Sequence, residues 1–339
     1  MLVEKLKSVD AFVVFDFEDA AFSTGVVRCA PKILVDGATW LARSQTYQLA
    51  SFELKGGGAS AGVNAPAEAR SDAIASFVGE IEPWVASRRL VPDAAKGVRG
   101  EDLESLHAVD PRPDAYWTRA GSFSAEGIVA SLEVALGGLA GQTVAIEGLD
   151  EIGVAVASAV IERGGRVVSV GTSAGAATDP AGFGAEALVS LWREHGVDLV
   201  RELAAEVEPG GAVLGASADA LVCGSRAGIV DHVVAAGCSV RTLVPSGPIP
   251  VTAKGLAVLT RAGVRVLPDF ITTAGPLVGG LAPALDGSVA SPSGVSEVVA
   301  AVLTEVVDDE HSPVLAACRR AESFIGGWRP SLPFGRPLA

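Results

Sequence analysis

The sequence predicts an α/β protein that combines a Rossmann-type, doubly wound parallel sheet with a second domain. Short apolar runs alternate with helical patterns from residue 142 onward, which is typical of a parallel sheet covered by helices. The first of these runs is followed by a glycine-bounded turn at residues 148–153, as in dinucleotide-binding units. The 339 residues suffice for two domains, and a hydrophobic content of 49% is typical of a globular protein.

The N-terminal part of the chain predicts strands and helices in a less regular order. Apolar runs between residues 9 and 35 predict strands, and the glycine-rich stretch 54–66 predicts a loop. Residues 122–141 predict a long helix that ends at glycines. The other predicted helices of this part cover residues 37–51, 71–88 and 100–109.

The remainder predicts a regular alternation without an internal repeat. The predicted strands are QTVAIEG at 142–148, RVVSVG at 166–171, ADALVCGS at 218–225, SVRTLVP at 239–245 and VRVLPDF at 264–270. The helices predicted between them lie near 151–163, 184–205, 226–236 and 252–262. Two more helices are predicted at 294–310 and 313–325.

The charge balance argues against nucleic-acid and anionic-membrane partners. The formal net charge is −14, from 40 acidic and 26 basic residues, so a polyanion would be repelled. The N-terminus carries acidic residues where a signal peptide needs an apolar core. The longest uncharged run, residues 270–285, is too short and too rich in Pro and Gly to span a bilayer. We therefore expect no membrane role.

The cysteines and histidines predict neither a disulfide framework nor a metal site. The four cysteines show no C-x-x-C spacing, so we expect reduced thiols and a cytoplasmic location. The four histidines are isolated and none has a ligand-like spacing to another, so we expect no metal. The residues concerned are Cys29, Cys223, Cys238, Cys318, His107, His195, His232 and His311.

Five short stretches resemble the motifs of one family, in the same order along the chain. They are LARSQTYQLAS at 41–51, KGGGASAGVNAP at 55–66, VPDAAKG at 91–97, SAEGI at 124–128 and PDFITTAGP at 268–276. These stretches are similar to the L-A-x-x-M-T-[WY]-K-N-A helix, the G-G-G-K-G-G loop, the P-x-x-D-x-G-T turn, the T-G-x-G-V helix start and the P-D-x-x-x-N-A-G-G segment of the Glu/Leu/Phe/Val dehydrogenases. The chain thus resembles these amino acid dehydrogenases over nearly its whole length.

The resemblance implies a segmented domain organisation. Residues 1–125 and 292–339 would form a substrate and oligomerisation domain, and residues 126–291 a Rossmann-type, dinucleotide-binding-like domain. It further implies a small-molecule ligand and NAD or NADP as the cofactor. The implied assembly is a homo-oligomer or a hetero-oligomer with a related dehydrogenase.

On the substrate side, the resemblance implies a changed set of reactive groups. Oxidative deamination needs a cation for the substrate carboxylate, a lysine that activates water, and a carboxylate that handles the amine proton. Gln48 and Ala59 stand where the family has its two lysines, whereas Asp93 matches the family's aspartate. Lys55 could reach the site, but a solvated lysine is the preferred interpretation. Further substrate contacts are expected from Gly57, Gly58 and Ser124.

On the cofactor side, Asp150 occupies the central glycine position of the G-x-G-x-x-G pattern. A carboxylate there adds bulk and repels a pyrophosphate, although Gly148 and Gly153 keep both ends of the turn. Helix N-capping is the preferred interpretation of this Asp, and an Asp that swings away when a dinucleotide enters is a third interpretation. The remaining expected cofactor contacts are Ile152, Thr172, which replaces the acidic ribose-binding residue, and Thr273, which replaces an amide.

Three functional hypotheses follow from the sequence. The first is an NAD(P)-linked oxidoreductase of an amino acid or a related small molecule, with Asp93 as proton carrier and Gln48 as carboxylate contact. The second is a catalytically inactive regulatory or ligand-binding subunit. The third and weakest is a serine hydrolase, because residues 58–62 and 171–175 match G-x-S-x-G, although a nucleophile elbow should be followed by a helix.

Overall fold

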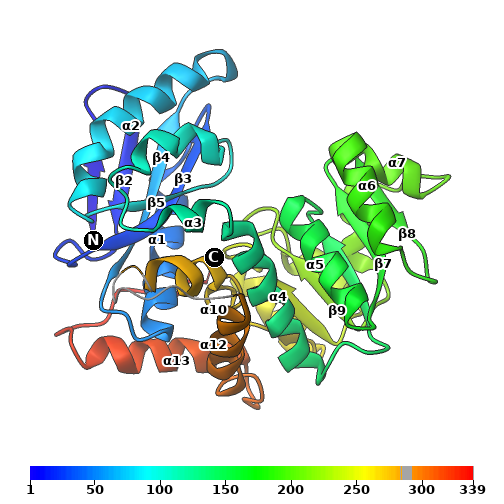
Figure 1. The fold of residues 1–339 in the computed structure, drawn as a ribbon. Helices are drawn as coiled ribbons and strands as arrows, with labels where there is room; N and C mark the ends of the chain where they lie inside the picture. The colour runs from blue at the N-terminus through cyan, green and yellow to red at the C-terminus, as the bar shows by residue number, and fades with distance from the viewer. Residues whose placement is uncertain (283, 285–291, 339) are drawn as a thin grey trace. The chain divides into compact units, whose positions relative to one another are not determined.

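The structure is a computed structural model that describes residues 1–282, 284 and 292–338 (Figure 1). The chain divides into two compact units. The first unit comprises Met1–Trp117, a short segment that begins at Gly280, and Cys318–Pro337. The second unit comprises Thr118–Gly279 and the segment up to Ala317 that contains the helix α12. In the part of the chain that is described, no helix is long and apolar enough to cross a membrane.

The first unit is built on a mixed five-stranded sheet of order β1-β2-β4-β3-β5. β1 and β2 pair antiparallel, as do β2 and β4, whereas β3 is parallel to both β4 and β5. The strands are β1 (Leu2–Lys5), β2 (Ala11–Phe15), β3 (Ser23–Ala30), β4 (Gly57–Asn64) and β5 (Val91–Ala94). The helices of this unit are α1 (Val35–Ser51), η1 (Ala67–Ala69), α2 (Arg70–Ala86), η2 (Gly100–Leu106) and α3 (Asp114–Trp117). The helix α13 (Pro313–Gly326) begins in the second unit and enters the first unit at Cys318.

Each face of this sheet is covered by a different helix. Alternate residues of the strands, such as Val13 and Ala61, pack with Ile74 and Phe77 of α2 in the main hydrophobic core. The opposite face, which includes Phe12, packs against α1. The strand residues that alternate with the core therefore face α1 and the surface beside it.

The prediction of a loop at 54–66 was wrong for its central part, and the prediction of a turn at 91–97 was wrong for its first four residues. Residues 57–64 form β4, an inner strand, and residues 91–94 form β5. Glycine has a low strand propensity, which is why the segment read as a loop. Packing explains the glycines, because a Cβ atom on Gly58 would lie 1.8 Å from the Ala42 carbonyl oxygen of α1.

The second unit contains a six-stranded sheet of order β11-β10-β9-β6-β7-β8. Five strands are parallel, as predicted, and run in the doubly wound manner. The sixth, β8, was not predicted and pairs antiparallel with β7 through a tight hairpin. The strands are β6 (Thr143–Glu147), β7 (Arg166–Thr172), β8 (Gly175–Thr178), β9 (Ala220–Cys223), β10 (Thr242–Pro245) and β11 (Arg265–Val266).

Helices cover both faces of this sheet, which is the expected α/β arrangement. α8 and α9 pack on one face through Ala235 and Leu256, and α4 and α5 lie side by side over the other. The helical elements are α4 (Ala120–Leu136), α5 (Glu151–Glu162), α6 (Ala185–His195), η3 (Gly196–Leu199), α7 (Val200–Leu203), η4 (Gly210–Gly215), α8 (His232–Gly237), α9 (Ala253–Arg261), α10 (Asp269–Thr272), η5 (Leu277–Leu281) and α12 (Pro292–Thr304). The predicted glycine stop of α4 is confirmed, since Gly137 is left-handed with φ +73°.

The two units differ from the predicted domains at two places. Residues 118–125 and α12 group with the second unit, whereas the sequence assigned them to the first domain. The reason is packing: α12 runs along α4, and Ser296 of α12 donates a hydrogen bond to Glu126 of α4. The predicted boundary at residue 291 lies outside the described residues. The functional roles given to the two domains remain predictions.

Candidate functional site

The carboxyl edge of the second unit's sheet is the expected position of a ligand-binding site. The chain leaves β6 toward β7 on one side and returns with β9 on the other, so the strand order reverses between β6 and β9. Ligands of doubly wound sheets bind outside the carboxyl ends of the strands at such a switch point. The predicted turn 148–153 follows β6 at this edge.

The turn has the backbone of a phosphate cradle but carries its own anion. Gly148 has φ +78°, a left-handed conformation that favours glycine. Asp150 is the N-cap of α5, and its Oδ1 accepts a hydrogen bond of 2.9 Å from the backbone N–H of Gly153. The capping interpretation is therefore confirmed. The consequence is that a carboxylate already occupies the N-terminus of α5, where the helix dipole favours negative charge.

A second carboxylate, which the sequence analysis missed, lies at the same edge. Glu147 is the last residue of β6 and is only 7% exposed. Its Oε2 accepts from the backbone N–H groups of Gly224 and Ser225, at 3.1 and 3.2 Å, and Oε1 accepts from the Ser225 hydroxyl. The signal in the sequence was an acidic residue at the end of an otherwise apolar strand.

The loops after β9 and β10 touch each other beside these groups. A Cβ atom on Gly224 would lie 2.1 Å from the backbone nitrogen of Gly247, so both positions need glycine. Ile249 has φ +51°, which is strained for a β-branched residue. Its backbone N–H donates to the Asp269 carboxylate at 2.8 Å, an interaction that helps to hold the strained backbone. Sequence patterns gave no indication of this strain.

The other predicted cofactor contacts use their polar groups within the unit. The Thr172 hydroxyl donates to the Val197 carbonyl at 2.7 Å and accepts from the Ala174 backbone. The Thr273 hydroxyl donates to the carbonyl of Asp269. Ile152 lines a cavity with Gly148, Asp150 and Gly153, so the structure does bring these four predicted residues together.

That cavity measures only about 50 Å³. Apolar side chains from α4, α5, β6 and β9 form its floor, and Gly224, Ser225 and Ser246 complete its rim. Pockets for small molecules usually measure roughly 300–1,000 Å³. The cavity therefore has room for a water molecule or a small group.

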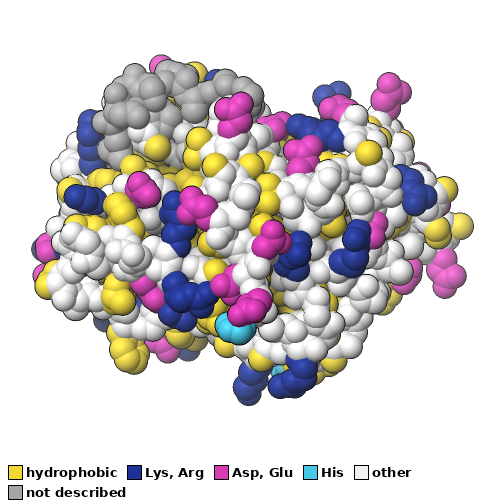
Figure 2. All heavy atoms as spheres, turned by 90° about the horizontal axis from the view of Figure 1, so that it is seen from below, with side chains coloured by type: hydrophobic (Ala, Val, Ile, Leu, Met, Phe, Trp, Pro, Cys, Tyr) yellow, Lys and Arg dark blue, Asp and Glu magenta, His cyan; other side chains and the backbone are white. Residues whose placement is uncertain are grey.

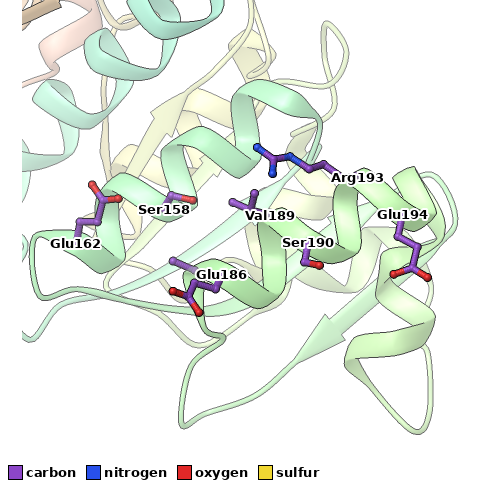
Figure 3. Close-up of a pocket in the computed structure, with 8 residues that line it drawn as sticks. Ser158, Glu162, Glu186, Val189, Ser190, Arg193 and Glu194 are labelled. Atoms are coloured by element: carbon purple, nitrogen blue, oxygen red, sulfur yellow. The ribbon is translucent and has the colours of Figure 1, made fainter.

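A larger hollow of about 650 Å³ lies between α5 and α6 (Figure 3). It is lined by Ser158, Glu162, Ala185, Glu186, Val189, Ser190, Arg193 and Glu194. α5 begins at the carboxyl edge and runs back across the sheet, so its residues 158 and 162 lie toward the opposite edge. The hollow contains none of the predicted site residues, and three glutamates against one arginine disfavour an anion there.

The first unit holds the predicted catalytic residue, Asp93, in a network of charged groups. Arg112 donates to Asp93 Oδ1 at 2.5 Å, and the Tyr116 hydroxyl donates to the same oxygen at 3.3 Å. Arg112 also donates through Nε and Nη2 to Asp110, at 2.9 Å in both bonds. The side chains of Arg112 and Asp110 are 2% and 1% exposed, whereas that of Asp93 is 37% exposed.

Arg112 is held as a permanent cation. Burial works against its charge, but Asp93 and Asp110 outweigh burial and raise the pKa of the guanidinium above its ordinary value. Burial and the neighbouring Asp93 raise the pKa of Tyr116, so its hydroxyl stays protonated. Sequence reasoning missed both residues, although an arginine among aromatics in DPRPDAYW is a signal for a cation–π contact, which Arg112 makes with Tyr116.

The other predicted substrate contacts are mainly buried. Gln48 is 6% exposed in α1, and Gly57 and Gly58 lie in β4, where Gly58 lets α1 approach closely. Ser124 lies in the second unit, and its hydroxyl donates to the Ala120 carbonyl one helical turn earlier. The joint action of these residues on a substrate remains a prediction.

The strand register shows on which face of the sheet the second lysine position, Ala59, lies. Ala59 is fully buried and packs in the core that α2 covers. Ser60 and Asp93 are both register partners of Val26, so their side chains leave the sheet on the other face. A side chain at position 60, rather than 59, therefore shares a face with Asp93.

The face shown in Figure 2 and the two G-x-S-x-G stretches indicate no other chemistry among the described residues. Positive and negative side chains are interspersed on the face shown in Figure 2. The described residues contain no group of three or more His, Cys, Asp or Glu that could hold a metal ion. Ser60 is fully buried within β4, and Ser173 lies in the β7–β8 hairpin. Neither serine is on a strand-to-helix turn, so the structure gives the hydrolase hypothesis no support.

Comparison with known proteins identifies the class of protein. The Glutamate/Leucine/Phenylalanine/Valine dehydrogenase family model matches residues 119–315, more than half of the chain. The chain belongs to this family of NAD(P)-dependent amino acid dehydrogenases.

Individual relatives are distant. The chain is 24% identical to the NADP-specific glutamate dehydrogenase A1 of Halobacterium salinarum over 282 residues, which are 74% of this chain and 66% of that protein. The hetero-hexameric glutamate dehydrogenase of Thermus thermophilus, in its Leu-bound form, has a similar fold, with a TM-score of 0.75 and 21% identity over 95% of this chain and 88% of that one. The L-tryptophan dehydrogenase of Nostoc punctiforme has a TM-score of 0.66 and 16% identity over 96% of each chain.

Proposed function

We propose that this chain is a non-catalytic, ligand-binding member of the family that binds NAD(P) weakly or not at all. The observation that carries the proposal is the capping of α5 by Asp150, whose carboxylate takes up the Gly153 N–H. A pyrophosphate needs these helix N-terminal donors, and it would meet a negative charge there. The residues at this edge therefore do not fit the cofactor that the family implies.

The size of the repulsion is sufficient to matter. Two unit charges about 4 Å apart repel each other by about 1 kcal/mol in water and about 4 kcal/mol at an effective dielectric of about 20. This range corresponds to roughly one to three decades in affinity. Thr172 adds no carboxylate for the ribose hydroxyls, and its own hydroxyl is used by Val197 and Ala174.

The first unit supports the same conclusion. α1, β4 and β5 contain no lysine, so positions 48, 59 and 60 offer neither a fixed cation nor an amine base. Loss of a general base alone typically lowers the rate about 10²- to 10⁴-fold. Asp93 keeps a carboxylate on this face, but Arg112 and Tyr116 bind one of its oxygens.

We further propose that the chain works in an oligomer, in the cytoplasm, as a regulatory or ligand-binding subunit. The Thermus thermophilus relative is a hetero-hexamer and was solved with Leu bound, which makes a small amino acid a reasonable first ligand to test. A homo-oligomer is the alternative assembly. Size-exclusion chromatography with light scattering, alone and with a co-expressed related dehydrogenase, distinguishes the two.

The second candidate function is an NAD(P)-linked oxidoreductase acting on an amino acid or a related molecule. One observation favours it: among the described residues, nothing bonds to Asp93 Oδ2, and this carboxylate is 37% exposed. It could thus accept a proton from a bound amine. In that case Asp150 would have to leave the helix terminus when the dinucleotide binds.

An activity assay separates the two candidates. Purified protein is incubated with Glu, Leu, Phe or Val and with NAD or NADP, and reduced cofactor is followed by absorbance. We expect no turnover above the level of a blank for any of the eight combinations. Robust oxidative deamination of one amino acid would refute the proposal and select the oxidoreductase.

A further inference from the structure

We propose that Glu147 is a second determinant that excludes anionic nucleotides from the second unit, an inference that rests on the proposed function. Glu147 ends β6 and Asp150 caps α5 three residues later, and each carboxylate satisfies backbone donors at the carboxyl edge of the sheet. Together they take the place that the phosphates of a ligand would occupy. The unit thus carries internal anions at its own switch point.

The contacts of Glu147 resemble those of a bound anion. Two backbone N–H groups and one hydroxyl converge on its carboxylate, all from the turn that follows β9. Among the described residues Glu147 takes part in no ion pair, so hydrogen-bond donors alone stabilise its charge. Such charge-assisted bonds are stronger than neutral ones. An incoming phosphate would have to displace this carboxylate or tolerate it as a close neighbour.

Glu147 connects the two strands between which the strand order reverses. β6 and β9 are neighbours in the sheet, and the bonds from Gly224 and Ser225 join the carboxyl ends of these two strands. Gly224 and Ser225 also form part of the rim of the 50 Å³ cavity, with Gly148 and Asp150. Glu147 therefore binds the rim residues Gly224 and Ser225, while Asp150 caps the N-terminus of α5.

Four proteins test the inference: the wild type, Asp150→Asn, Glu147→Gln and the double variant. Asn can still cap α5, and Gln can still accept from both N–H groups and donate to Ser225, so each substitution removes a charge and keeps the shape. NAD is titrated into each by calorimetry at low salt. The double variant should bind NAD about 10- to 1,000-fold more tightly than Asp150→Asn alone, the range expected for removing one nearby charge.

Control variants separate the effect of the Glu147 charge from the effect of the hydrogen bonds that hold the rim of the cavity closed. Glu147→Asp keeps the charge, and Ser225→Ala keeps it while removing one contact, so neither should improve binding when combined with Asp150→Asn. The advantage of the double variant should largely persist between about 50 mM and about 300 mM salt, because Glu147 is 7% exposed and buried charges are screened little. Thermal melting verifies that each variant is folded.

The outcomes are distinguishable. If the double variant binds no better than Asp150→Asn, or does not bind at all, Glu147 is not a determinant. Equal gains from Glu147→Asp or Ser225→Ala would show that closure, and not charge, excludes the ligand, which also overturns the inference. Tight binding by the wild type would refute the proposed function itself.

Discussion

Replacement of Arg112 by alanine should destabilise the first unit severely. The Arg112 side chain is 2% exposed and forms two bonds to the Asp110 carboxylate, which is 1% exposed. Arg112→Ala leaves Asp110 as a buried, uncompensated anion, a change that typically costs about 3–5 kcal/mol. A domain is stable by only about 5–15 kcal/mol, so the loss should be obvious in a urea titration.

Two further variants make the Arg112 experiment specific. Asp93→Asn removes the half-exposed partner and should cost about 1 kcal/mol or less, because exposed ion pairs contribute little. Replacing both buried partners by apolar residues, Asp110→Leu with Arg112→Met, should recover most of the stability lost in Arg112→Ala. Unfolding is followed by tryptophan fluorescence, since Trp117 lies against Arg112. A loss below about 1 kcal/mol for Arg112→Ala, or equal losses for Arg112→Ala and Asp93→Asn, would refute this account of the network.

Three other perturbations test separate parts of the structure. Asp150→Ala should lower the free energy of unfolding by about 1 kcal/mol through loss of the α5 cap, whereas Asp150→Asn should change it little. Equal losses for the two variants in urea titrations would argue against capping. Gly58→Ala should destabilise the protein by about 1–3 kcal/mol, because the added Cβ would meet the Ala42 carbonyl. Gly79→Ala, in the exposed part of α2, should stabilise the protein by about 0.5–1 kcal/mol. Melting temperatures that change in the same direction for both variants would contradict the packing described for Gly58. Burial lowers the pKa of His107, so the unfolded chain binds the proton more readily and the free energy of unfolding falls as the pH drops through about 6.5. His107→Gln should reduce the loss of unfolding free energy between about pH 7.5 and about pH 5.5. An unchanged loss would show that His107 titrates normally.

Much of the second unit could be predicted because its signals are local. The alternation of apolar strands with helices gave β6, β7, β9 and β10, and the identity of Asp150 gave the cap of α5. A cap needs only a side chain and an N–H three residues away, so a short window of sequence contains the whole interaction. β8 was missed because its pairing with β7 follows a short turn inside a segment that lacked an apolar alternation.

The missed features depend on residues that are distant in the sequence. Glu147 is buried against Ser225, which lies 78 residues further on, and no periodicity reports that contact. β4 looked like a loop because its glycines have low strand propensity, yet α1 requires a glycine at position 58. The orientation of Ala59 into the core likewise follows from pairing with β2 and β3, and the sequence of the segment alone does not specify it.

We propose that the carboxylates of Asp150 and Glu147, at the edge of the second unit, take the place of the cofactor's phosphates. A calorimetric titration of NAD, and separately of NADP, into the unmodified protein tests this proposal. We predict no heat of binding beyond dilution at cofactor concentrations up to about 1 mM, which bounds the binding free energy at about −4 kcal/mol. Saturable binding with a dissociation constant of about 10 μM or tighter would contradict the proposal, because a dinucleotide would then coexist with Asp150 and Glu147.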